Sequence, residues 1–111
     1  DVNDTTSSRV EKTLRAMALT VADEPEVAAA CTTALLSGND AAVRTVRERI
    51  GGEIHRRIRA AVGPDPDPRT LAALEMTFFG ALVNAGSGAF TYHQIADRLS
   101  YVVGLIVGDD K

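Results

Sequence analysis

The residue most able to do chemistry is Glu75, the only charge between Thr70 and Phe90. A helical wheel places it near the centre of an apolar stripe made of Leu71, Leu74, Phe78 and Leu82 and widened by Met76, Phe79 and Val83. A carboxylate in such surroundings is costly unless it is paired, protonated or open to a solvated cavity. Two alternatives remain: an ion pair with Arg47 or Arg57, or a polar group inside a mostly apolar ligand pocket.

The other reactive side chains form no catalytic or metal-binding pattern. His55 and His93 lie far apart without metal-ligand spacing, which favours surface or interface roles. Cys31 is the single cysteine and falls on an apolar helix face, as a small core residue would. The sequence contains no zinc-protease motif, phosphate-binding glycine loop or nucleophile elbow. We therefore expect no enzymatic activity, no metal and no cofactor; catalysis by Glu75 as general base is the weakest alternative, because no second catalytic group accompanies it.

Composition favours one compact domain over residues 1–111, with 45% hydrophobic and 24% charged residues. The net charge of −3 argues against nucleic-acid contact by this chain alone, since such domains carry basic patches. The polar start without a signal peptide and the single cysteine predict a cytoplasmic protein. The apolar run beginning at Thr70 contains Glu75 and Asn84 and lacks flanking anchors, so no membrane span is expected.

Apolar residues recur at three- and four-residue spacing along the chain, which predicts an all-α fold. The expected architecture is an antiparallel bundle of about five helices that dimerises through the last two. The expected ranges are Thr5–Ser8 to about Ala22, Glu24 to about Leu36, about Asp40 to Ala61, Pro68 to an end between Ala85 and Gly88, and Tyr92 to about Val107. Asp67 and Thr91 should cap the last two helices. The pair Gly51-Gly52 predicts either a bend or close packing of a neighbouring helix.

The helix that begins at Pro68 has no charged face, which predicts burial on both sides. Small or neutral residues opposite its apolar stripe leave room for a second copy of the helix. Together with part of the last helix they could form a four-helix bundle about a two-fold axis. The predicted dimer interface consists of Thr77, Gly80, Ala81, Asn84, Tyr101, Gly104 and Leu105.

The inward faces of the first four helices predict a mostly apolar pocket for a small molecule. The candidate ligand-binding residues are Met17, Val21, Cys31, Leu35, Arg47, Ile50, Ile54, Glu75, Phe78, Phe79 and Leu82. A helical protein–protein interaction module without a pocket, which docks a partner through the last two helices, is the alternative.

The order of helices resembles the C-terminal regulatory domain of TetR-family transcriptional repressors. The resemblance rests on a short Pro-initiated helix (24–36), a long basic helix (40–61), a Pro-rich loop and two closing apolar helices ending LSYVVGLIVGD. It implies a homodimer through the last two helices and a pocket for an apolar effector. The family's N-terminal helix-turn-helix domain is absent from this sequence, so DNA binding is expected only of the full-length protein.

Overall fold

The computed structural model describes residues 5–24, 26, 28–30 and 41–108, with the backbone alone at position 43. Its helices are α1 (Thr6–Ala22), α3 (Ala41–Val62), α4 (Pro68–Gly86) and α5 (Tyr92–Val107). The described residues contain no strand, and the all-α class is confirmed. Of the helix expected over 24–36, only 26 and 28–30 are described as helical, and the rest lies outside the described residues.

Polar side chains begin three of the helices, as the sequence predicts. The Thr5 hydroxyl accepts a hydrogen bond from the Ser8 amide at 3.0 Å, at the start of α1. The Asp67 carboxylate accepts from the Arg69 amide at 2.8 Å, with Pro68 in the first turn of α4. Thr91 and Gln94 exchange reciprocal bonds in a capping box before α5. These contacts satisfy amides that a helix start leaves without partners.

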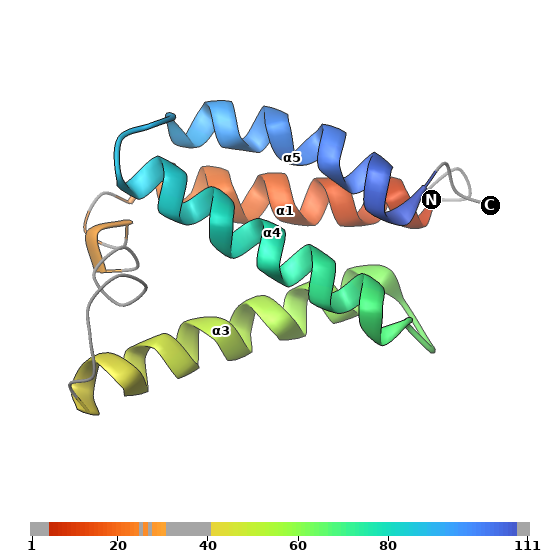
Figure 1. Ribbon diagram of the computed structural model, residues 1–111, viewed down its shortest axis with the longest axis horizontal. Helices are drawn as coiled ribbons and strands as arrows, with labels where there is room; N and C mark the ends of the chain where they lie inside the picture. Colours follow the sequence, from red (N-terminus) through yellow and green to blue (C-terminus); the bar gives the residue numbers. More distant parts are fainter. Residues whose placement is uncertain (1–4, 25, 27, 31–40, 109–111) are drawn as a thin grey trace.

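The four helices pack as antiparallel neighbours (Figure 1). Helix α5 lies along α1, and α1 also packs against α3. Helix α4 runs diagonally from the end of α3 toward the beginning of α5 and contacts both of these helices (Figure 1). Through these contacts, the apolar stripes of all four helices meet in one shared core.

The core is made of the apolar stripes that periodicity predicts. Leu74 and Phe78 of α4 and Leu14 of α1 are at most 1% exposed. The buried set is Val10, Leu14, Ala18, Ile54, Ile58, Ala61, Leu71, Leu74, Phe78, Leu82, Ala85, Ile95, Ala96, Leu99 and Val103. Met76 was expected to widen the α4 stripe, and this is wrong: its side chain is 75% exposed. Two helical positions from Phe78 correspond to about 200°, which turns Met76 to the outer side of α4.

The two glycines of α3 have different surroundings. The helix continues through both, and a Cβ at Gly51 would lie 3.7 Å from Cζ of Phe79 in α4. A Cβ at Gly52 would meet no described atom within 4 Å. Close packing of a neighbouring helix therefore applies at Gly51, while Gly52 lies on the outer side of α3.

Candidate ligand-binding groove

A groove of about 890 Å³ lies between α1 and α3, with α4 at its floor. Its volume lies within the range of about 300–1,000 Å³ typical of small-molecule sites. The lining residues are Arg9, Lys12, Thr13, Ala16, Met17, Thr20, Val21, Arg49, Ile50, Glu53, Ile54, Arg57, Ala60, Ala61, Phe78 and Leu82. Most of the lining is apolar, and charged groups are confined to α1 and α3.

Six of the predicted ligand-binding residues meet in this groove. Met17 and Val21 come from α1, Ile50 and Ile54 from α3, and the last two, Phe78 and Leu82, from α4. The sequence places them together because each lies on the inward stripe of its own helix. Phe78 and Leu82 are almost fully buried and support the floor, whereas Met17 and Ile50 are half-buried along the walls.

Three other candidates lie away from the groove lining. Phe79 packs on the core beside Gly51, on the α3 side of α4. Arg47 is half-buried on α3 and is not among the lining residues. Glu75 points to α3 on the same side as Phe79 and is also outside the lining. Cys31 and Leu35 lie outside the described residues.

Glu75 contacts a residue that the sequence did not suggest. Its Oε2 lies 2.5 Å from Nδ1 of His55 in α3, and the side chains are 23% and 47% exposed. The predicted ion pair with Arg57 is wrong, because the Arg57 Nε donates to Glu53 instead. A helical wheel shows that Glu75 faces a neighbour, but the register of α3 against α4 decides which residue it meets.

Because this contact is partly exposed, Glu75→Gln should change the free energy of unfolding by less than about 1 kcal/mol. Urea denaturation of the variant, of His55→Gln and of the double variant measures the coupling between the two residues. A loss of several kcal/mol in Glu75→Gln would contradict this and would indicate a buried charge pair.

The charged rim of the groove was missed by the sequence interpretation. Arg9 and Lys12 of α1 and Arg49 and Arg57 of α3 line it, with Glu53 the one carboxylate among the lining residues. The sequence signal for the α1 wall of the groove is the series Arg9, Thr13, Ala16 and Thr20, which follows helical spacing beside the apolar stripe of α1. The sequence predicts a solvated outer face for most arginines of α3 and places Arg57 beside the apolar stripe. Arg56 lies outside the groove lining, whereas Arg49 and Arg57 line it.

Two sets of contacts, one of Arg9 and one of Glu53, define the electrostatics of this rim. Arg9 donates from Nε to the Ala61 carbonyl oxygen at 3.1 Å and from Nη2 to the Thr6 hydroxyl. Hydrogen bonds from Arg57 and then Arg56 lower the pKa of the Glu53 carboxyl below its usual range. Glu53 is therefore ionised at neutral pH and shared between two guanidinium groups.

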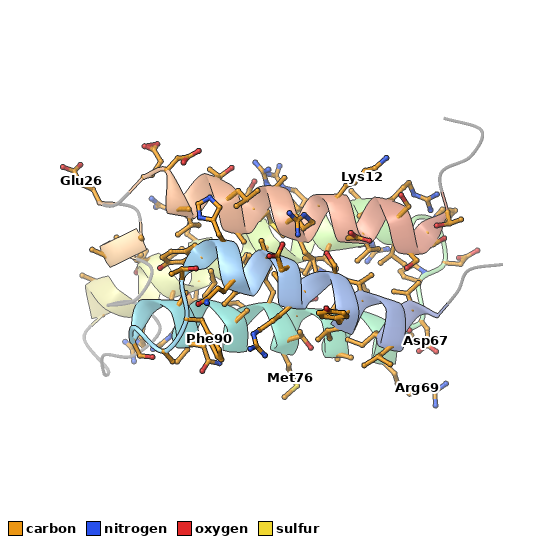
Figure 2. All side chains as sticks on the ribbon, turned by 90° about the horizontal axis from the view of Figure 1, so that it is seen from above. Lys12, Glu26, Asp67, Arg69, Met76 and Phe90 are labelled. Atoms are coloured by element: carbon orange, nitrogen blue, oxygen red, sulfur yellow. The ribbon has the colours of Figure 1, made fainter. Side chains whose placement is uncertain are left out.

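The residues predicted for a dimer interface lie mainly on the outer face of α4 and α5. Gly80, Asn84, Tyr101 and Leu105 are exposed, and Tyr101 and Leu105 are 76% and 85% exposed. Met76 of α4, which the sequence interpretation had assigned to the core, points away from the body of the bundle (Figure 2). Three large exposed apolar side chains, Met76, Tyr101 and Leu105, thus lie on these two helices.

The remaining interface candidates are half-buried within one chain. Thr77 and Ala81 lie on the α5 side of α4, and Ala81 packs against the core. Gly104 is one turn after Ser100, whose hydroxyl accepts a hydrogen bond from Arg15 of α1 at 3.4 Å. Gly104 therefore lies on the α1 side of α5, at the edge of the outer face rather than at its centre.

Two further properties of the described helices and side chains concern membranes and metal ions. Within the described part of the chain, no helix is long and apolar enough to cross a membrane. Over the same residues, no group of three or more His, Cys, Asp or Glu side chains could hold a metal ion.

The chain is similar in sequence to known proteins that are named transcriptional regulators. It is 68% identical over 108 residues to proteins named uncharacterized HTH-type transcriptional regulators in Mycobacterium bovis and in two strains of Mycobacterium tuberculosis. The match covers 96% of this chain and 51% of each relative, so the chain spans about half the length of these relatives. No family model matches the chain. No solved structure matches it either.

Proposed function

We propose that this chain is the effector-binding and dimerisation domain of a TetR-like transcriptional repressor. The observation that carries the proposal is the apolar groove between α1, α3 and α4, which six predicted ligand-binding residues line. The relatives named HTH-type transcriptional regulators support a role in transcription regulation. In the full-length protein, DNA contact would belong to chain outside this acidic bundle.

The groove suits a ligand that is mostly apolar. Its floor is made of Phe78 and Leu82, and its walls include Met17, Ile50 and Ile54. Transfer of apolar ligand surface from water to such a floor contributes about 25 cal/mol per Å² buried. A ligand that separates α1 from α3 would act on the long helix and so on the rest of the regulator.

The outer face of α4 and α5 supports the dimerisation part of the proposal. Met76, Tyr101 and Leu105 are all at least three-quarters exposed. Gly80 offers a close approach beside them, since a Cβ there would meet no described atom within 4 Å. Two such faces related by a two-fold axis would bury these side chains against one another.

The proposal predicts a dimer, so sedimentation velocity of the 111-residue chain should give twice the monomer mass of 11.8 kDa. A monomer would favour the alternative, a module that docks a different protein through the same face. The proposed ligand site is tested with 1-decanol. At a free concentration ten times its Kd, decanol should stabilise the fold by about 1.4 kcal/mol and raise the Tm by several degrees. A monomer whose Tm does not respond to decanol would contradict the proposal.

A further inference from the structure

We propose that ligand binding in the groove tightens the dimer, because both events order the middle of α4. This inference rests on the proposed function and states how its two sites regulate each other. It is carried by the position of α4, which among the described helices is the only one that belongs both to the groove and to the outer face of α4 and α5.

The two sites lie on opposite sides of α4. Phe78 and Leu82 form the groove floor and are 1% and 3% exposed. Met76 and Gly80 lie on the outer face, where Met76 points away from the bundle (Figure 2). The groove walls come from α1 and α3, which take no part in the outer face. A ligand and a second copy would therefore be separated by the width of one helix, about 10 Å.

The stretch of α4 between these two sides is a weak helix former by composition. Residues 77–80 are a threonine, two phenylalanines and a glycine. All four rank below alanine and leucine in helix propensity, and only proline ranks below glycine. The β-branched and aromatic side chains lose rotamer freedom against the preceding turn of a helix. Helix α4 nevertheless continues through the stretch, so its helical order depends on packing.

Two sides of this stretch are open within a single chain. A Cβ at Gly80 would meet no described atom within 4 Å. On the other side, Phe78 and Leu82 lie under a groove of about 890 Å³. A ligand would cover this floor, and a second copy would cover Gly80. Each would oppose local opening of α4, so whichever binds first lowers the ordering cost that remains for the other.

Thermodynamic linkage makes the effect reciprocal. Saturating 1-decanol should lower the Kd of the dimer by about tenfold, which lies within the range typical of coupled sites. Sedimentation velocity over a series of protein concentrations measures this change. Isothermal titration calorimetry should give a decanol Kd that is lower by the same factor above the dimer Kd than below it.

Amide hydrogen exchange tests whether order in α4 carries the coupling. At protein concentrations below the dimer Kd, decanol should slow exchange of the amides of residues 77–83. The amides of α5, which does not line the groove, should respond less. Exchange at residues 77–83 that is the same with and without decanol would overturn the inference.

Three variants separate ordering from other effects of decanol. Gly80→Ala raises the helix propensity of the stretch and adds one methyl group on its open side. Since the stretch is then ordered in advance, decanol should change the dimer Kd of this variant clearly less than that of the wild-type chain. Gly52→Ala is the matched control in α3, with equally open surroundings outside the groove lining, and should keep the full coupling. Ala16→Trp places bulk on the exposed edge of the groove, so decanol should leave its dimer Kd unchanged.

The outcomes separate this inference from the function on which it rests. A dimer and decanol binding that are both present but independent would overturn the coupling and leave the proposed function in place. A dimer weakened by decanol, or full coupling in Gly80→Ala, would also overturn it, since the ligand would then act by moving α4 and not by ordering it. A monomer at every concentration would overturn the coupling together with the proposed dimerisation. Absence of decanol binding would overturn it together with the groove as the effector site.

Discussion

Replacing Phe78 by alanine should lower the free energy of unfolding by about 3–5 kcal/mol. Phe78 is 1% exposed and is among the largest fully buried side chains of the described core. It also forms part of the groove floor, so its removal takes away core contacts and deepens the groove. The loss combines the hydrophobic free energy that the buried phenyl ring contributes with the cost of the cavity that the surrounding helices cannot fill.

Chemical denaturation followed by circular dichroism measures this effect, and the neighbouring phenylalanine supplies the control. Phe79 is only half-buried and faces Gly51 on the side of α3. Phe79→Ala should therefore cost clearly less than Phe78→Ala. Equal losses for the two variants would show that the orientation of α4 in the bundle is wrong.

Replacing Gly80 by leucine should break the dimer while it stabilises the isolated chain. Gly80 is exposed in α4, and an added Cβ would meet no described atom within 4 Å. In the monomer, the loss of a helical glycine should therefore contribute about 0.8–1 kcal/mol of stability. In the proposed dimer, the larger side chain would separate two helices that pack through small residues, and a Kd increase of about tenfold or more is expected.

Sedimentation over a range of protein concentrations measures the change in dimer affinity. Gly52→Leu is the control, since Gly52 has the same open surroundings but lies on the outer side of α3. It should raise the stability by a similar amount and leave the dimer intact. If Gly80→Leu and the wild-type chain dimerise equally, the outer face of α4 is not the interface.

Periodicity predicts the elements and the core of this protein well. The stripe of Leu71, Leu74, Phe78 and Leu82 identifies the buried face of α4 because four positions of one helix share one direction. Asp67 with Pro68 locates the start of that helix to the residue, since capping depends on a few adjacent side chains. Such features are local, and a single sequence contains them.

The site was predicted less completely, because it depends on how helices face each other. His55 meets Glu75 only through the relative register of α3 and α4. Arg57 was recognised as lying near the apolar stripe of α3, but its partner Glu53 and its place at the groove rim follow from the direction in which α1 packs. Met76 shows a further limit, since an apolar residue type was taken as a sign of burial although its angle points outward.

The bond from Arg9 to Ala61 joins the beginning of α1 to the last turn of α3. A guanidinium there also suits the negative end of the α3 dipole. While this bond is kept, the two helices cannot separate evenly, because one end of the pair is held together. Any widening of the groove must pivot there, and the largest displacement falls at the other end, near Thr20 and Arg49. A small molecule between the helices would thus produce an angular movement of α3, with the lever arm set by the length of the helix.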